Sequence, residues 1–320
     1  MTFRHFIAGW LAPLALACGP ALAADYPVKP VKLVVPLAPG GSADGVARLL
    51  AGELGRLWGQ PVVVENRAGA AGVIGVSAVA RSPADGYTIL LTPISITTGH
   101  IYNKDPGYDA DKSFAHITQL ISTHYLVSVN SSLPVNSLAE LVSYAKAHPH
   151  QIFHGAGAGG MFLAFEEFRE LAGIDVEQVN YRGEAPAMSA LAAGDVQVVF
   201  SSMLAAKPFI DSGRAKPLAF MSPQREPYAP GIPSAPESGV SGLEIAFWFG
   251  LSAPAGTPAP IVDKIARDVH KILKRPDVIG KLNDYGFVPH PSTPAEFRQR
   301  VATETARWTA VAQRAGIEAQ

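Results

Sequence analysis

Residues 34–48 read VVPLAPGGSADGVAR, and in this stretch an apolar run passes through a glycine turn into a helical pattern. The run over residues 31–37 is rich in valine and predicts a buried strand. Ser42 stands where a side chain can cap a helix, and Gly59 stands where that helix would stop. Between these two residues, apolar side chains recur at helical spacing on one face: Val46, Leu49, Leu50, Leu54 and Leu57.

Strand and helix patterns go on alternating along the chain, which predicts an α/β fold with mainly parallel strands. The chain has 320 residues, enough for two domains with large cores. Ser137 and Glu140 are spaced as a capping box, and Thr293 precedes another helix start. The further predicted strands read PVVVEN, YTILLT, LVSVN, QIFH, VEQVNY, VQVVF and FWFGLSAP.

The first 24 residues are typical of a secretory signal peptide. Arg4 precedes an uncharged apolar run over residues 6–17, and Ala21-Leu22-Ala23 forms an A-x-A cleavage site. This run is too short for a comfortable membrane span. An alternative is that Cys18 is a lipidated cysteine. We expect a soluble protein exported to the periplasm.

The amino-acid composition of the chain narrows the set of functions that we expect. The one cysteine lies in the leader, so we expect no disulfide, thiolate chemistry or cysteine metal site in the mature protein. The 26 basic and 27 acidic residues nearly balance, and no basic cluster occurs. Nucleic acid and anionic membranes are therefore not expected partners.

Three glycine turns each precede a predicted helix: Gly40-Gly41-Ser42, NRAGAAGVIG over residues 66–75, and GAGAGG over residues 155–160. Free N–H groups at a helix start, together with the helix dipole, form a seat for an anion. The alternative is that glycine only permits tight strand-to-helix turns. Three such turns in one chain favour anion binding.

Two cofactor hypotheses are weaker. GAGAGG also satisfies G-x-G-x-x-G, with Glu177 at the distance of a ribose-binding acid. Free dinucleotides are scarce outside the cytoplasm, however, so we expect no cofactor. The histidines of HPHQIFH (His148, His150 and His154) suggest a metal, but Pro149 hinders their convergence and no acid or cysteine lies nearby. A solvated helix end is favoured.

Catalytic patterns are also weak. The sequence has no G-x-S-x-G elbow. Glu166, Glu167 and Glu170 fit the solvated face of an amphipathic helix, and Asp44 with Arg48 fits an i,i+4 ion pair. An exported esterase-like α/β hydrolase remains the alternative to a binding protein.

Five segments resemble the Bug family of periplasmic solute receptors, which is related to the receptor of tripartite tricarboxylate transporters. The likeness covers essentially the whole chain after the leader, and ENRAGAAGVIG and APAGTP are its most specific parts. The five segments are YPVKPVKLVVPLAPGGSADGVAR, VVVENRAGAAGVIG, ADGYTILL, VNYRGEAPAMSALAAGDV and FWFGLSAPAGTPAPIVDKI.

The resemblance implies a type II periplasmic-binding fold, with two α/β lobes joined by two crossing strands and a ligand cleft between them. Residues 1–24 would be the signal peptide, residues 25–124 and 248–320 the first lobe, and residues 125–247 the second. It also implies a non-catalytic receptor that binds a small organic carboxylate, mainly through backbone amides. A membrane permease or a sensor would be its partner, and we expect a monomer.

The same resemblance implies the ligand-binding residues. From the first lobe these are Pro39, Gly40, Gly41, Ser42, Ala43, the loop Ala68, Gly69, Ala70 and Gly72, and Thr92. From the second lobe they are Gly157, Ala158, Gly159, Gly160, Met161 and, in place of the family's usual Asp, Gln197.

Two departures from the family pattern concern specificity. Gly159, Gly160, Met161 and Phe162 stand where the family commonly carries Ser or Thr and a nearby His, and Gln197 replaces an acid. We therefore predict that the distal end of the ligand is apolar or aromatic, instead of a second carboxylate or an ammonium group. The alternative is that these side chains point into the core.

Overall fold

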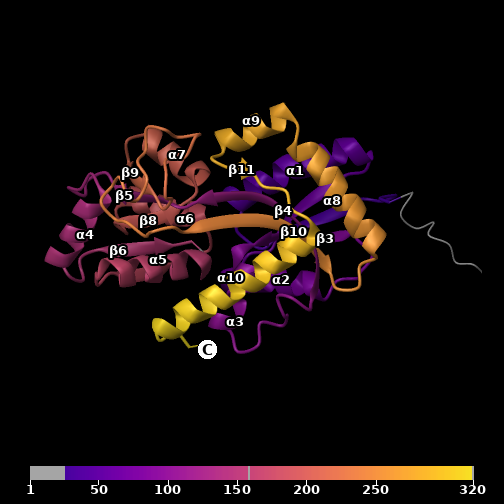
Figure 1. The fold of residues 1–320 in the computed structure, drawn as a ribbon, viewed down its shortest axis with the longest axis horizontal. Helices are drawn as coiled ribbons and strands as arrows, with labels where there is room; N and C mark the ends of the chain where they lie inside the picture. Colours follow the sequence, from indigo (N-terminus) through magenta and orange to yellow (C-terminus); the bar gives the residue numbers. More distant parts are fainter. Residues whose placement is uncertain (1–25, 158, 319–320) are drawn as a thin grey trace, which may run out of the picture.

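The computed structural model describes residues 26–157 and 159–318; the expected signal peptide, Cys18 and Ala158 lie outside them. Two β-sheets, each covered by helices, lie end to end along the long axis (Figure 1). Chain segments run from one sheet to the other at two places. The predicted α/β class with two lobes is confirmed, but the prediction of mainly parallel strands is wrong, because both sheets also contain antiparallel pairs.

The six-stranded sheet contains the opening strand-turn-helix unit. β1 pairs in parallel with β2 and β3, as expected for consecutive βα units, whereas β10 is antiparallel to both of its neighbours. In spatial order its strands are β11 (Val288–Pro289), β4 (Phe114–His124), β10 (Ala246–Pro254), β3 (Thr88–Pro93), β1 (Val31–Val35) and β2 (Val62–Asn66).

Helices cover both faces of this sheet (Figure 1). On one face lie α1 (Ser42–Trp58), α8 (Ala259–Leu273) and α9 (Pro276–Asp284); on the other lie α2 (Val73–Ala80), α3 (Gly99–Tyr102) and α10 (Pro294–Arg314). Two short 3₁₀ turns, η2 (Ala70–Gly72) and η3 (Ile94–Thr97), precede α2 and α3.

The five-stranded sheet forms the second half. β6 pairs in parallel with β7 and β8, and β5 is antiparallel to β8 and β9. In spatial order its strands are β7 (Glu177–Asn180), β6 (Phe153–Ala156), β8 (Val198–Ser201), β5 (Leu126–Asn130) and β9 (Ala215–Phe220). Its helices are α4 (Leu138–Ala147), α5 (Gly159–Ala172), α6 (Glu184–Ala193) and α7 (Met203–Asp211).

Hydrogen bonds tie the two connections together where they cross. β4 continues through Tyr125 into β5, and the chain returns through Ile245 into β10. The Tyr125 amide donates to the Ile245 carbonyl over 3.2 Å, and the Ile245 amide donates to the Met221 carbonyl over 3.0 Å. The Met221 amide donates to the Tyr125 carbonyl over 2.8 Å. The junction is thus a small paired ribbon.

Most predicted helix ends are confirmed, with one correction at the site. Gly59 ends α1 in the left-handed conformation, and Thr293 forms a full capping box. The N-cap of α1 is Gly41, however, and Ser42 is its first helical residue, without a side-chain cap. The backbone N–H group of Ser42 has no acceptor within the helix, so it can donate to a group outside the helix.

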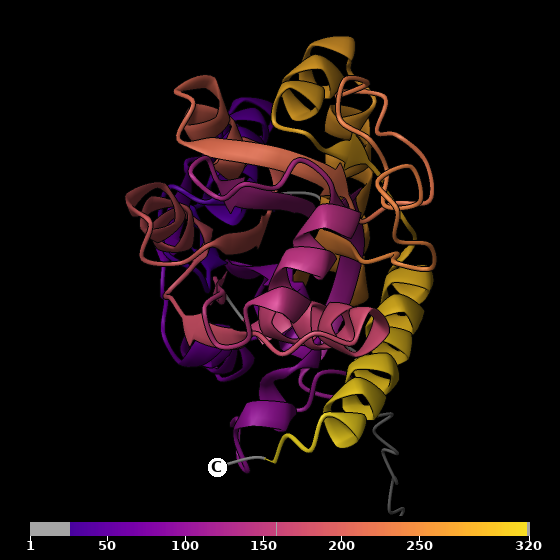
Figure 2. The same ribbon diagram turned by 90° about the vertical axis from the view of Figure 1, so that its left-hand side faces the viewer.

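α10 packs on both halves of the protein. Figure 2 shows it alongside α5, where Arg307 pairs with Glu167 at 3.0 Å and Arg314 pairs with Glu170 at 3.3 Å. Glu166 is buried and binds Arg169 at 2.8 Å. The predicted solvated face of α5 is therefore wrong at Glu166, whereas Glu170 is exposed as predicted. Leu57, expected in the apolar face of α1, is also about half exposed.

Substitution of Gly250 tests how closely α10 packs on the crossing strand β10. It lies at a bulge in β10, and a Cβ there would come within 2.1 Å of the Phe297 ring of α10. We expect Gly250→Ala to lower the free energy of unfolding by roughly 1–3 kcal/mol, because the buried ring must move. Gly52→Ala in α1, with open space around it, should instead raise it by roughly 0.5–1 kcal/mol. Urea midpoints measure both; equal midpoints would contradict this packing.

Candidate ligand-binding site

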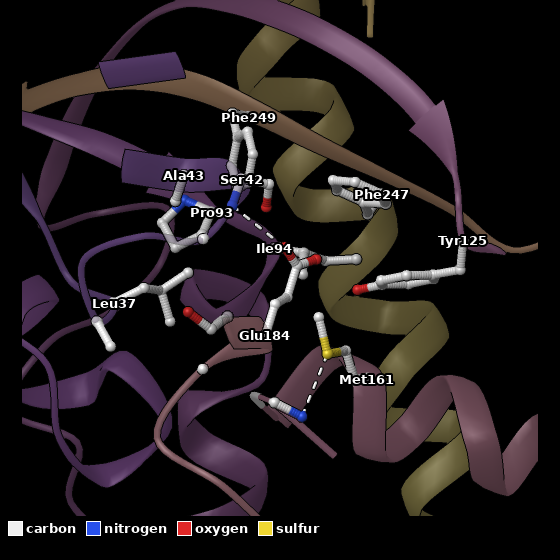
Figure 3. Close-up of a pocket in the computed structure, with 15 residues that line it drawn as sticks. Leu37, Ser42, Ala43, Pro93, Ile94, Tyr125, Met161, Glu184, Phe247 and Phe249 are labelled. Atoms are coloured by element: carbon white, nitrogen blue, oxygen red, sulfur yellow. Dashed lines mark hydrogen bonds between the residues drawn. The ribbon is translucent and has the colours of Figure 1, made fainter. Parts of the chain in front are cut away.

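A cavity of about 40 Å³ lies between the two sheets, beside the crossing strands (Figure 3). The chain reaches it just after β1, β3, β6 and β7, at the carboxyl ends of these strands. Open α/β sheets bind ligands in this position, because helix N-termini and loops converge there. The interlobe location therefore identifies the cavity as the candidate site.

The walls of the cavity are mostly apolar. They come from both sheets and from the crossing strands, so neither half forms the site alone. Tyr125, between β4 and β5, stacks on Phe247 with ring centroids 4.7 Å apart. The apolar wall residues are Leu37, Pro93, Ile94, Met161, Phe247 and Phe249.

Glu184 is the acidic residue of the cavity, and sequence reasoning did not identify it. It begins α6 and is 7% exposed. Its Oε2 accepts hydrogen bonds from the Ser42 amide over 3.2 Å and from the Ser202 hydroxyl over 3.0 Å. Its Oε1 accepts from the Ser202 amide over 3.2 Å. Burial raises the pKa of Glu184, and these hydrogen bonds oppose that rise.

The glycine turn after β6 also directs an amide toward this region. The Gly157 N–H group contacts the Met161 sulfur at 3.2 Å, a weak acceptor supplied by the same turn. Figure 3 shows Met161 and Glu184 on neighbouring sides of the cavity. Amides from two glycine turns, one in each lobe, thus face acceptors of the protein itself.

Ser95 is a second polar residue that sequence reasoning missed. It lies in η3, lines the cavity and is 2% exposed. Its hydroxyl has no hydrogen-bond partner among the described residues. A buried hydroxyl without a partner costs free energy, so such a group beside a cavity is suited to bind a ligand atom.

The structure brings only some of the predicted site residues to the cavity. Thr92 is buried, and its hydroxyl donates to Ser252 over 2.8 Å. Gln197 lies at the opposite end of β8 and binds backbone groups of Phe153 and Gly194. The predicted residues that do line the cavity are Gly41, Ser42, Ala43, Gly157 and Met161.

The loop at residues 68–72 forms a separate feature next to the site. Gly69, Ala70, Ala71 and Gly72 all have positive φ, an unusual run that includes two alanines. A Cβ on Gly72 would meet the Ser95 hydroxyl at 2.7 Å. This loop therefore supports the wall at Ser95, and a direct ligand contact by Ala68, Gly69, Ala70 or Gly72 stays a prediction, as it does for Pro39, Gly40, Gly159 and Gly160.

The histidines of HPHQIFH have separate environments. His148 stacks on Tyr144, and His150 is exposed. His154 is buried, stacks on Phe165 and binds Gln178 through Nδ1. Over residues 26–157 and 159–318, no group of three or more His, Cys, Asp or Glu side chains has a metal-binding arrangement.

Two lobes, two crossing strands and a cavity between them define the class of periplasmic solute-binding receptors. The family model of the tripartite tricarboxylate transporter family receptor matches residues 46–317, and the chain belongs to this family. The family consists of receptors and not of enzymes, so the hydrolase alternative is not supported.

Solved structures agree with this assignment. R. palustris Rpa4515 with adipate is 36% identical, covers 92% of this chain and 100% of its own, and has a TM-score of 0.89. The periplasmic binding protein BugD is 33% identical, with coverages of 92% and 100% and a TM-score of 0.87. MatC from Rhodopseudomonas palustris with bound malate is 31% identical, with coverages of 90% and 100% and a TM-score of 0.83.

In the part of the chain that the structure describes, no helix combines the length and apolar character needed to cross a bilayer.

His154 predicts a pH dependence of stability. Burial lowers its pKa to about 3, whereas an unfolded chain protonates histidine near pH 6.5. The unfolded state therefore binds more protons as the pH falls from about 6.5 toward 3, and the free energy of unfolding should drop by roughly 1.4 kcal/mol per pH unit. His154→Gln should have a shallower dependence in urea titrations. His116, with its pKa lowered to about 4, contributes equally to both proteins. Parallel curves would contradict the assignment.

Proposed function

We propose that this chain is an extracytoplasmic receptor that binds a small organic carboxylate in the interlobe cavity and delivers it for uptake or sensing. In this proposal residues 1–24 direct export to the periplasm. Residues 25–124 with 248–320 form one lobe, and residues 125–247 form the other. A membrane permease or a sensor takes the ligand from a monomeric receptor.

The observation that carries the proposal is the chemistry of the cavity walls. The Ser42 amide at the start of α1, which donates to Glu184 in this structure, and the buried Ser95 hydroxyl are neutral donors, and no Lys, Arg or His lines the cavity among the described residues. Neutral amides and a helix dipole stabilise an anion without a fixed counter-ion. The relatives solved with adipate and with malate support a carboxylate as that anion.

The size of the cavity requires movement of its walls. A volume of about 40 Å³ holds only a few water molecules, and pockets for small organic ligands measure roughly 300–1,000 Å³. The walls belong to both lobes, so separating the lobes enlarges the cavity. Closure onto the ligand then supplies contacts from the second lobe and stabilises the closed state.

The apolar walls favour a ligand with an apolar body. Phe247, Phe249 and Ile94 can cover a ring or a methylene chain, whereas a short polar diacid would leave its second carboxylate against them. We therefore propose an aromatic or aliphatic monocarboxylate. Adipate, which combines four methylene groups with two carboxylates, is the informative competitor.

A thermal-shift screen of the mature protein tests the ligand class. The panel contains benzoate, nicotinate, hexanoate, adipate, succinate, malate and aspartate. A ligand at about a hundred times its Kd adds roughly 2.7 kcal/mol to the free energy of unfolding, and we expect this shift with benzoate or hexanoate. Preference for succinate or malate would contradict the apolar-body proposal. No shift with any carboxylate, from protein shown by native mass spectrometry to carry no ligand, would contradict the receptor proposal.

Ser95→Ala tests the unpaired hydroxyl. Loss of one hydrogen bond to the ligand should weaken binding about 3- to 10-fold, which corresponds to roughly 0.5–1.5 kcal/mol. Ser128→Ala is the matched control, because the Ser128 hydroxyl is equally buried and without a partner but lies in β5 away from the cavity. Titration calorimetry with the strongest ligand of the panel measures both. Equal affinities in the two variants would remove Ser95 from the site.

A further inference from the structure

Glu184 connects the two halves of the protein across the proposed ligand site. Its carboxylate is fixed to its own half by the amide and the hydroxyl of Ser202, which follows β8. Ser42, in the first helix of the other half and 142 residues away, also binds this carboxylate through its amide and its side chain (Figure 3). Separation of the lobes would break the contacts with Ser42 and leave the bonds to Ser202 in place.

The backbone around this contact is closely packed. A Cβ on Gly183 would lie 3.3 Å from the Ala38 side chain, and one on Gly157 would lie 2.8 Å from the Glu184 amide. Gly183 also has a φ of 144°, which disfavours other residues. The closed arrangement thus holds the start of α6 against the start of α1, with the Glu184 carboxylate where an anion would bind.

The charge around Glu184 is not balanced by a cation. Among the described residues that line the cavity, none is basic. Tyr125 faces the carboxylate from the junction between β4 and β5 (Figure 3), and burial raises the pKa of its hydroxyl, so it stays neutral. Asp44 lies in the first turn of α1, and Arg48 pairs with its Oδ2 at 2.9 Å. The loop at Gly157 and the wall of β10 present neutral groups: an amide, Met161, Phe247 and Phe249.

Two ionised carboxylates cannot share this site at low cost. A ligand carboxylate bound to the α1 amides would lie against Glu184 after closure, in a buried volume without a positive charge. Like charges at such a distance repel strongly when water is excluded, and one of the pair takes up a proton. A protonated Glu184 can then donate its O–H group to the ligand carboxylate while it keeps its bonds to Ser202.

We propose that binding of a carboxylate ligand is coupled to uptake of one proton by Glu184, which changes from an acceptor at the Ser42 amide into a hydrogen-bond donor to the ligand. This inference rests on the proposed function. In this proposal Glu184 sets the pH dependence of ligand binding. Glu184 also disfavours ligands that carry a second carboxylate near α6.

The sign of the pH dependence follows from linkage. If the pKa of Glu184 is higher in the complex than in the free receptor, the complex binds more protons between the two values, and affinity falls as the pH rises through that interval. The limit is about tenfold per pH unit for one proton. Benzoate and adipate are ionised above about pH 6.5, so the ligand does not supply this effect there.

The experiment is titration calorimetry of the wild-type protein with benzoate, and with adipate in parallel, between about pH 6.5 and 9. Buffers of different ionisation enthalpy give the number of protons taken up directly. We expect uptake approaching one proton per ligand in part of this range, with the matching loss of affinity toward high pH. This measurement requires no variant.

Glu184→Gln then locates the proton. Its amide oxygen can still accept from the Ser202 amide and its N–H group can donate to the ligand, so we expect binding without proton uptake and an affinity that is independent of pH. At pH 9 it should bind at least about tenfold more tightly than the wild type. Glu177→Gln, an exposed glutamate of β7, is the matched control and should retain the wild-type dependence.

The outcomes separate the two proposals. Binding of benzoate or adipate by the wild type without proton uptake would overturn the role of Glu184 and leave the receptor function intact. Proton uptake that persists in Glu184→Gln would also overturn it. Loss of benzoate and adipate binding in a folded Glu184→Gln would also overturn it, because the Gln amide can donate to a carboxylate as a protonated Glu184 would. Absence of binding by the whole carboxylate panel would overturn both proposals.

Discussion

The pairing of β4 with β10 is the constraint on which the site depends. These two strands are antiparallel neighbours over most of their length, and each leads directly into the ribbon at Tyr125, Met221 and Ile245. Their ends therefore cannot move apart independently. Because Tyr125 and Phe247 are part of this junction, the same hydrogen bonds that join the sheets also place two walls of the cavity.

Any movement of one lobe relative to the other involves this junction and α10, because both contact the two halves of the protein. α10 packs against β4 and η3 and reaches α5 through Arg307 and Arg314. These ion pairs are partly exposed, and such pairs contribute little to stability. They resist lobe separation weakly, whereas the buried contact of Glu184 with Ser42 changes its energy with the protonation state. The electrostatic control of closure is therefore concentrated at the cavity.

The fold could be predicted well from the sequence, because its signals are local. The glycine turn before α1, the stop at Gly59 and the capping box at Thr293 are each encoded within a few residues. The family resemblance then supplied the arrangement of two lobes, which local patterns do not specify. Leu57 was misplaced because helical spacing defines a face but not its width.

The site was predicted only in part, for a physical reason. Backbone donors such as the Ser42 amide could be located, because a glycine turn and a helix start produce them wherever they occur. The groups they meet come from distant segments: Glu184 lies 142 residues from Ser42, and Ser95 lies in a short turn without a motif. Gln197 was expected near the ligand from its place in the family pattern, yet it lies at the other end of β8.

This division between backbone and side chains bears on how one fold serves different carboxylates. The amide donors follow from the path of the chain, so a relative with the same path retains them whatever its side chains. The relatives with adipate and malate share this path at 36% and 31% identity. Met161 and Glu184 lie in the first turns of α5 and α6, where a side chain can change without a change in the strands. Selectivity in this chain should therefore reside in those two turns, because the opposite wall at Phe247 is fixed by the strand pairing that holds the lobes together.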